Sequence, residues 1–234
     1  MTETICALAS ASGRSGVAVI RVSGSDASKA ISILTGRNLP EPRKASVRKL
    51  YRSSTSSRGE LLDEALVLWM PSPHSFTGED VAEFHVHGGV AITDAVLEAC
   101  LKIPNVRLAE PGEFTRRAFE NEKLDLTQAE AVGDLIDAET DAQRQQALNQ
   151  YEGRLKDVME KWRSKLIQAM ASLEAAIDFP DEDDVPLGID TRAYGVLCDL
   201  RSDLVSNLEE ASAGLSTRDG FKIAIVGEPN AGKS

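Results

Sequence analysis

The last eight residues of the sequence combine glycine, lysine and serine in an order that suits phosphate binding. Gly227-Glu228-Pro229-Asn230-Ala231-Gly232-Lys233-Ser234 matches the pattern G-x-x-x-x-G-K-[ST] at every required position. In such a loop, backbone N–H groups surround the phosphates, Lys233 supplies a positive charge and the Ser234 hydroxyl binds Mg²⁺. The apolar run 221–226 predicts the strand that leads into the loop. The sequence therefore predicts a nucleotide-binding loop.

The sequence stops where this loop would continue into a helix. A complete nucleotide site also needs elements that position water and bind the base. We therefore expect the front part of a larger nucleotide-dependent protein, inactive by itself in nucleotide hydrolysis. Asn230 has two interpretations. Its side-chain carbonyl binds a monovalent cation beside the phosphates, or the residue simply favours a turn.

A second set of chemically competent residues lies in the apolar run 81–86 and just after it. Glu83, His85 and His87 alternate with Ala82, Phe84 and Val86, so they share one face of a predicted strand. A metal site or a polar wall would both fit this spacing. A half-buried Glu83 needs a partner. That partner is either a planar amino-pyrimidine ring, which a carboxylate binds through two parallel bonds, or an arginine such as Arg21.

Composition and charge limit the possible classes of protein. The 234 residues are 42% hydrophobic and 27% charged, as in globular proteins, and no apolar run approaches the ~20 residues of a membrane span. We expect a cytoplasmic protein with no membrane partner, because the N-terminus carries Glu3 and lacks the basic-then-apolar pattern of a secretory signal. The three cysteines are widely spaced, which favours free thiols over disulfides or a zinc site.

The net charge of −11 is concentrated in the second half of the chain, after residue 120. One basic cluster stands out, and only Glu41 opposes it: Arg37, Arg43, Lys44, Arg48, Lys49, Arg52 and Arg58. It is either a solvated strand and loop or a surface that faces RNA. The acidic run 181–184 is either a solvated loop or a docking site for a basic partner.

The first 120 residues mix strands and helices without a strict alternation, which predicts an α+β domain. We expect strands at 4–9, 16–22, 64–70 and 81–86, and helices at 25–34 and 91–101. Residues 53–59 should form a hairpin tip.

The pattern changes to long helices after Leu124. Thr127-Gln128-Ala129-Glu130 fits a capping box, which predicts a helix beginning there. A seam in steps of three and four extends from Leu155 to Ala176, and Pro180 ends that helix. A further helix at 190–213 should precede a linker between Gly214 and Gly220. If these helices form an incomplete bundle, a partner helical segment from beyond residue 234 is needed to complete it.

Six motifs, in this order, together resemble the MnmE (TrmE) family of tRNA-modification GTPases. They are Ser75-Phe76-Thr77-Gly78-Glu79-Asp80, His87-Gly88-Gly89, Pro111-Gly112-Glu113-Phe114, the run 123–131 (KLDLTQAEA), the run 175–182 (AAIDFPDE) and the loop 227–234. The resemblance implies three parts: a folate-binding, dimerising α+β domain over 1–120 that is similar to aminomethyltransferases, an incomplete all-helical domain over 121–219, and the first strand and loop of a Ras-like GTPase domain over 220–234.

The resemblance also implies an activity and its partners. Family members act with the flavoprotein MnmG, as a heterotetramer, and install a (carboxymethyl)aminomethyl group at C5 of the wobble uridine of certain tRNAs. The one-carbon unit comes from 5,10-methylene-tetrahydrofolate, for which 5-formyl-tetrahydrofolate is a stable substitute, and GTP hydrolysis drives conformational change. By resemblance, the protein is a homodimeric GTP hydrolase.

The family's binding residues fall on specific positions of this sequence. Folate contacts would be Arg21, Glu83 and Lys123. GTP contacts would be Asn230, Ala231, Gly232, Lys233 and Ser234, with Asn230 on K⁺ and Ser234 on Mg²⁺, and no catalytic residue lies within these 234. Two other hypotheses stay open: a stand-alone folate-dependent aminomethyltransferase, and an interaction scaffold that has lost its ligand.

Overall fold

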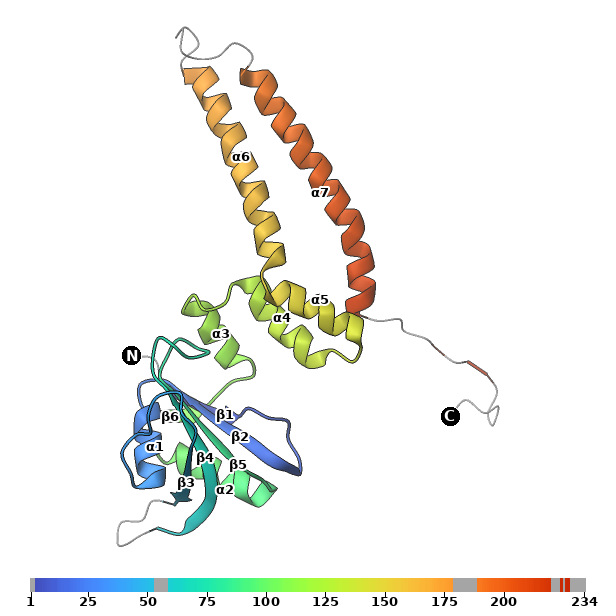
Figure 1. Ribbon diagram of the computed structural model, residues 1–234. Coiled ribbons are helices and arrows are strands. Elements are labelled where there is room, and N and C mark those ends of the chain that lie inside the picture. The colour runs from blue at the N-terminus through green and yellow to red at the C-terminus, as the bar shows by residue number, and fades with distance from the viewer. Residues whose placement is uncertain (1–2, 53–58, 179–188, 220–223, 225, 228–234) are drawn as a thin grey trace. The chain divides into compact units, whose positions relative to one another are not determined.

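The structure is a computed structural model that describes residues 3–52, 59–178, 189–219, 224 and 226–227. The chain divides into two compact units, Met1–Asp125 and Leu126–Ser234 (Figure 1). The first unit combines a sheet with helices, and the second is helical. Among the described helices, none combines the length and apolar character needed to cross a bilayer.

The first unit is built on a six-stranded sheet with the order β3-β4-β5-β2-β1-β6. Every pair of neighbours is antiparallel except β1 and β6. This mixed sheet confirms the predicted α+β class. The strands are β1 Thr4–Leu8, β2 Ser15–Ser23, β3 Ser46–Tyr51, β4 Leu61–Met70, β5 Val81–Gly88 and β6 Val106–Leu108.

Two helices cover one face of this sheet, α1 (Ala27–Thr35) and α2 (Val90–Leu101) (Figure 1). Alternate residues of the strands face them, and in β5 these are Ala82, Phe84 and Val86, all buried. They form one apolar cluster with buried residues of both helices. Because apolar burial is the main favourable term in folding, this cluster holds the unit together.

The opposite face of the sheet carries two rows of side chains that the strand pairing brings side by side. One row, mostly apolar, crosses four strands: Val47, Leu66, His85 and Val19. The adjacent row consists of Leu68, Glu83, Arg21 and Ala7. Val47 is 64% exposed, and the other members of both rows are half-buried. We call this surface the open face.

A network of ion pairs fastens helix α3 (Glu113–Glu120) to the sheet and to the loop before β5. Arg117, 6% exposed, donates to both carboxylate oxygens of Glu79 at 3.2 and 3.0 Å and to Glu113 at 3.0 Å. Glu113, 1% exposed, also accepts two bonds from Arg107. Arg117 and Glu113 are charged and buried, but both have partners of opposite charge, which is the condition for keeping them there.

The described residues of the second unit form four helices, α4 (Leu126–Asp137), α5 (Asp141–Tyr151), α6 (Arg154–Asp178) and α7 (Ile189–Asp219). The helix predicted to start at Thr127 is confirmed, but α4 begins one residue earlier, at Leu126, so Thr127 lies in its first turn and is not its N-cap. The capping box is at the start of α5, where Thr140 and Gln143 satisfy each other's backbone N–H groups.

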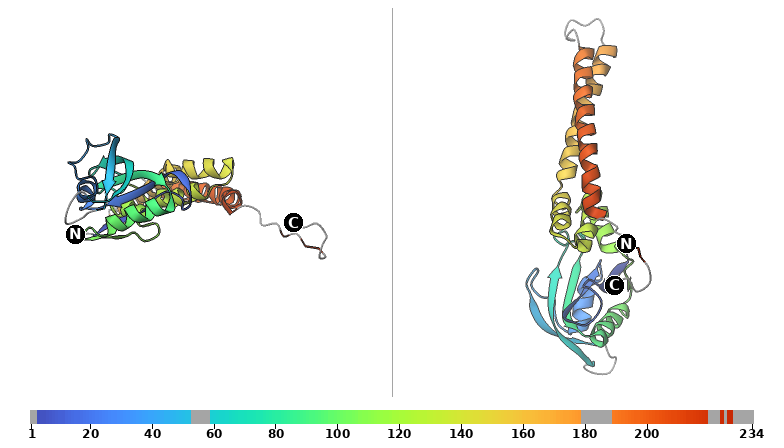
Figure 2. Two further views of the ribbon diagram at one scale, coloured as in Figure 1. Left: turned by 90° about the horizontal axis from the view of Figure 1, so that it is seen from below. Right: turned by 90° about the vertical axis from the view of Figure 1, so that its right-hand side faces the viewer.

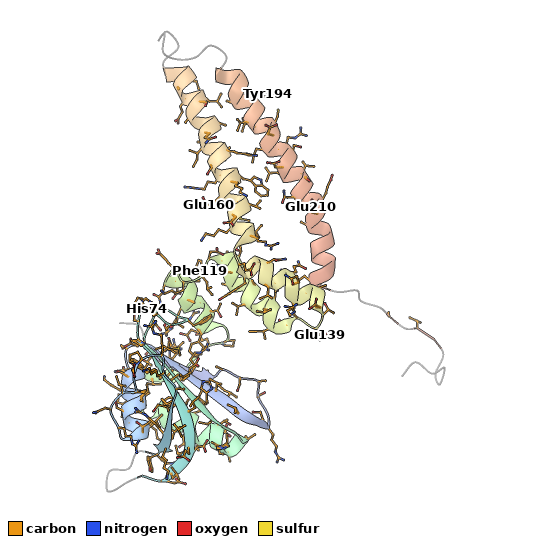
Figure 3. The ribbon with its side chains drawn as sticks, in the orientation of Figure 1. His74, Phe119, Glu139, Glu160, Tyr194 and Glu210 are labelled. Carbon is orange, nitrogen blue, oxygen red and sulfur yellow. The ribbon has the colours of Figure 1, made fainter. Side chains whose placement is uncertain are left out.

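Helices α6 and α7 run side by side as a long antiparallel pair (Figures 1 and 2). Helix α6 ends at Asp178, as predicted from Pro180. The predicted linker after 213 is wrong, because α7 continues through Gly214 to Asp219. Figure 3 shows Tyr194 and Glu210 projecting from α7, and Glu160 from α6.

Large apolar residues of this helix pair stay exposed. Of the predicted seam, Ala169 is buried, whereas Leu155, Met159, Leu166 and Leu173 are at least a third exposed. On α7, Leu208 and Tyr194 are 74% and 70% exposed. Such a surface is typical of a bundle that lacks a helix. That a further segment completes it stays a prediction.

Acid should weaken the first unit through Glu113. Hydrogen bonds from Arg107, aided by those from Glu110 and Arg117, outweigh burial and hold the pKa of Glu113 at about 2. The unfolded chain has an ordinary glutamate, with a pKa of about 4.3. Ionised Glu113 therefore stabilises the fold fully above about pH 5, and this stabilisation falls as the pH drops toward 2. We expect a loss of about 2 kcal/mol between pH 7 and pH 3.

Urea unfolding of the natural protein, Glu113→Gln and Glu110→Gln at several pH values measures this loss. Glu110 is an exposed control carboxylate that pairs with Arg116. Glu113→Gln should be less stable at pH 7 and should have a flatter acid slope. An acid slope equal to that of the natural protein would show that another group is responsible.

Candidate functional site

The sheet pairs Arg21 of β2 directly with Glu83 of β5 on the open face. Both Nε and Nη2 of Arg21 lie 2.8 Å from Oε1 of Glu83. The two side chains are 25% and 13% exposed, so the pair is partly screened from water but accessible from one side. Of the two partners that the sequence left open for Glu83, the arginine is the one bound in this structure.

Two phenylalanine rings flank the guanidinium group of Arg21. The Cζ atom of Arg21 lies 5.5 Å from the ring centroid of Phe76 and 5.5 Å from that of Phe114. Phe76 belongs to the loop before β5, and Phe114 to the first turn of α3. The negative faces of aromatic rings attract a cation at this distance, so the rings fix the position of Arg21.

Lys123 approaches this region across Gly78. A Cβ atom at Gly78 would meet Cε of Lys123 at 3.1 Å and Cγ at 3.3 Å, so the lysine stem lies directly on the glycine. Gly78 has a φ of 76°, a conformation that glycine adopts at little cost. Lys123 itself is exposed, and the described residues offer its ammonium group no carboxylate partner. The side chain of Lys123 thus lies against Gly78, which follows Phe76 by two residues in the loop, with an ammonium group that has no ion-pair partner among the described residues.

The loop 71–80 is held in place by side chains from outside it. Asn121 donates to the carbonyl oxygen of Thr77 at 2.7 Å. The Ser23 hydroxyl lies 2.7 Å from the hydroxyl of Thr77 and donates to Glu79 at 2.7 Å. Glu79 is in turn bonded to Arg117. These contacts join the loop to β2 and α3, the same elements that carry Arg21 and Phe114.

The two histidines of β5 have different environments. Nε2 of His85 lies 3.3 Å from Oε2 of Glu83, beside the ion pair. His87 instead faces Asp63 of β4, with 2.8 Å between its Nδ1 and Oδ1. Burial raises the pKa of Asp63, but hydrogen bonds from His87 and Glu64 outweigh it and leave the pKa below its usual value. No metal-binding group of three ligands occurs within the described residues, and the polar-wall interpretation fits His85.

Cysteine chemistry does not contribute to this site. All three cysteines are free, as predicted, and Cys6 and Cys100 are buried in the core. Burial raises the pKa of the Cys6 thiol to about 11 and raises that of Cys100 further. Both are therefore protonated and unreactive at neutral pH.

The arrangement suits recognition of a planar, nitrogen-rich ligand rather than bond making by the protein. The carboxylate of Glu83 can accept two parallel N–H bonds, while Arg21 and Lys123 can bind carbonyl or carboxylate oxygens. The sequence identified these three residues but assigned no role to Phe76, Phe114, Glu79 or Arg117. Phe76 and Glu79 belong to the motif S-F-T-G-E-D, and Phe114 belongs to P-G-E-F, which Arg117 follows. Only the folded chain brings Phe76 and Phe114 to Arg21.

The other predicted sites lie outside the described residues. These are the nucleotide residues Asn230, Ala231, Gly232, Lys233 and Ser234, the acidic run 181–184, and residues 53–58 of the predicted hairpin tip. Strands β3 and β4, on either side of that tip, do pair antiparallel as a hairpin requires. Of the final predicted strand, the described residues Ala224 and Val226 have no strand pairing.

Comparison with known proteins places both units in one family. Residues 4–123 match the family model described as GTP-binding protein TrmE N-terminus, and residues 126–228 match the MnmE helical domain. The chain is 55% identical over 234 residues to a protein of Phenylobacterium zucineum named tRNA modification GTPase MnmE. It is 56% identical, again over 234 residues, to the protein of that name from Caulobacter vibrioides.

Each of these alignments covers 100% of this chain and 51% of the relative. The chain thus spans about half the length of the curated relatives that it matches. A protein from Methylobacterium with the same name is 47% identical over 235 residues, which cover 53% of its length. With a family model matched across each unit, the chain belongs to the MnmE (TrmE) family.

Proposed function

We propose that this chain is the folate-binding and dimerising part of a cytoplasmic tRNA-modification GTPase. Together with the flavoprotein MnmG, the complete protein installs a (carboxymethyl)aminomethyl group at C5 of the wobble uridine, using a tetrahydrofolate one-carbon unit and GTP hydrolysis. Support for the activity comes from relatives named tRNA modification GTPase MnmE. Support for the folate module comes from one observation: on the open sheet face, Arg21 is paired with Glu83 and flanked by two phenylalanine rings.

Glu83 is the group that recognises the pterin ring. The amino group and the adjacent ring N–H of a pterin form a planar donor pair, and a carboxylate is the matching acceptor. In this structure Nε and Nη2 of Arg21 both bind one oxygen of the Glu83 carboxylate, Oε1. When folate binds, Arg21 exchanges these bonds for one to a ligand oxygen, and the two phenylalanines keep it close to the ring. Lys123, which has no carboxylate partner among the described residues, binds the anionic side of the ligand.

A second copy of the chain covers the open face. The row Val47, Leu66, His85 and Val19 lies next to the Arg21–Glu83 pair, and Val47 is largely exposed. Helices α1 and α2 cover only the other face. Exposed apolar residues beside partly exposed polar ones are characteristic of an interface. Packing two open faces together would bury this row and exclude water from both folate sites.

The remaining parts of the proposal concern the nucleotide. The loop 227–234 binds GTP, with Lys233 on the phosphates, Ser234 on Mg²⁺ and Asn230 on K⁺. The helical unit is completed by a segment of the natural protein outside these 234 residues, which covers the exposed residues of α6 and α7. The acidic helical half, residues 121–219, is the surface offered to MnmG.

Replacing Glu83 should abolish most folate binding. Glu83→Gln keeps the shape but turns one acceptor oxygen into a donor, so the affinity for 5-formyl-tetrahydrofolate should fall about 10- to 100-fold, as for a lost charged hydrogen bond. Isothermal titration calorimetry measures this change. Glu64→Gln is the matched control, because Glu64 is an exposed carboxylate of β4 on the same sheet face as Glu83. Equal affinities for the two variants would remove the role assigned to Glu83.

Charge on the open face should separate the dimer. Val47→Asp places a carboxylate in the apolar row, and desolvating it in the interface is unfavourable. We expect a dimer for the natural protein and a monomer for this variant in sedimentation equilibrium. The control is Val90→Asp, since Val90 is 54% exposed and belongs to α2, on the other side of the sheet. A dimeric Val47→Asp protein would place the interface elsewhere.

The complete protein should hydrolyse GTP faster in K⁺ than in Na⁺. In this proposal, the side-chain carbonyl of Asn230 helps to bind K⁺ beside the developing negative charge, and Na⁺ is too small for the same site. Steady-state GTPase assays in the two salts test this, with Asn230→Ala as the variant that should lose the difference. Equal rates of the natural protein in both salts would argue against a K⁺ site.

A further inference from the structure

Four basic residues lie along the β3 edge of the first unit and have no assigned role in folate binding. They are Arg37 and Arg43, in the segment between α1 and β3, and Arg48 and Lys49, within β3 itself. Arg48 and Lys49, consecutive in the strand, project from its two opposite faces. Strand β3 is the outermost strand of the sheet, so this edge is accessible along one side (Figure 1). We call these four residues the basic edge.

Most other cations of the first unit have acidic partners, whereas the four basic-edge residues, like Arg14 and Lys123, have no ion pair within the described residues. Eight other Lys and Arg residues of the first unit are ion-paired: Arg21, Lys29, Lys44, Arg52, Lys102, Arg107, Arg116 and Arg117. Within the described part of the chain, none of the four basic-edge residues has a carboxylate within ion-pair distance. Between residues 37 and 49 there are five basic residues and one acidic residue, Glu41, which Lys44 neutralises.

Two of these cations are close enough to oppose each other. Burial and the positive charge of Arg37 both lower the pKa of Arg48. The guanidinium of Arg48 is held in place by bonds to the carbonyl oxygen of Asn38 and to the Ser46 hydroxyl. A fold that fixes like charges together without an internal anion leaves them available for an external one.

Arg43 occupies a backbone conformation that does not favour arginine. Its φ is 61°, in the left-handed region that glycine and asparagine adopt more readily. Its backbone N–H donates to the carbonyl oxygen of Trp69 at 2.7 Å, a bond that any residue except proline could make. The Arg43 side chain makes no ion pair or hydrogen bond within the described part of the chain, so no contact there requires an arginine at this position.

Protection of an edge strand accounts for only part of this pattern. Charged side chains on an outermost strand prevent pairing with other chains, and Lys49 and Arg48 serve that purpose. Arg37 and Arg43 precede the strand and cannot. The whole chain carries a net charge of −11, so a local excess of cations stands out against a field that repels polyanions elsewhere.

We propose that the basic edge binds the phosphate backbone of the tRNA substrate. The inference rests on the proposed function, which supplies an RNA polyanion as substrate. Guanidinium groups bind phosphate oxygens through two parallel bonds, and three of the four residues are arginines. Such contacts orient an RNA without reading its sequence, and they release counterions, so the binding is strongly dependent on salt.

The test compares two double variants of the complete natural protein. Arg37→Gln/Arg43→Asn removes two basic-edge charges, and asparagine suits the left-handed backbone at position 43. Lys102→Gln/Arg144→Gln removes two charges that are already paired, with Glu98 and Asp141. Binding of fluorescently labelled, unfractionated tRNA is measured from 50 to 200 mM KCl, and calorimetry with 5-formyl-tetrahydrofolate confirms that each variant is folded.

We expect the basic-edge variant to bind tRNA about tenfold more weakly at 100 mM KCl, and the slope of log affinity against log salt to decrease by about 1.4 to 1.8. The paired-charge control should keep the natural affinity and slope. Equal behaviour of the two variants, or no tRNA binding by the natural protein at 50 mM KCl, would overturn the inference. Binding of the same proteins to phosphatidylserine vesicles is measured in parallel. If the basic-edge variant lost vesicle binding but kept the natural affinity for tRNA, the inference would likewise be overturned. Folate affinity should be unaffected throughout, so failure here leaves the folate proposal standing.

Discussion

The candidate site depends on the buried side chain of Arg117. This one guanidinium bonds Glu79 of the loop before β5, Glu113 of its own helix and the backbone carbonyl of Glu3. Loop, helix and sheet are thereby fixed to one another. The loop contributes Phe76 and the helix contributes Phe114, and between these rings Arg21 is held against Glu83. Breaking a buried ion pair of this kind costs about 3–5 kcal/mol, so the geometry of the site is tied to the stability of the fold.

The two faces of the sheet have different tasks. One face meets α1 and α2 and forms the core around Phe84. The other face presents a polar pair beside an apolar row and remains partly accessible. Within β5 the division follows from the alternation of side chains along a strand: Phe84 contributes to the core, and its neighbour Glu83 contributes to the site. A ligand or a second copy at the open face would therefore leave the core undisturbed.

Much of the first unit could be predicted from local sequence, because the alternation of side chains along a strand and the position of glycines at turns and helix ends are local properties. Glu83 was assigned to a polar face on that basis, and β5 confirms it. The cage around Arg21 could not be predicted, because Phe76 and Phe114 are distant from Arg21 in sequence and are brought to it by tertiary contacts, among them those of Arg117 and Ser23. Thr127 and Thr140 both have a suitable partner three residues later, but only Thr140 stands directly before its helix, because α4 begins at Leu126 and α5 at Asp141.

The most direct test of this account is a crystal structure of the complete protein with 5-formyl-tetrahydrofolate. The account predicts that the carboxylate of Glu83 accepts two bonds from the pterin ring and that Arg21 has left Oε1 of Glu83 but stays between Phe76 and Phe114. It also predicts that the ammonium group of Lys123 lies on the anionic side of the ligand. A bound folate at another surface, with the Arg21–Glu83 pair intact, would contradict the account.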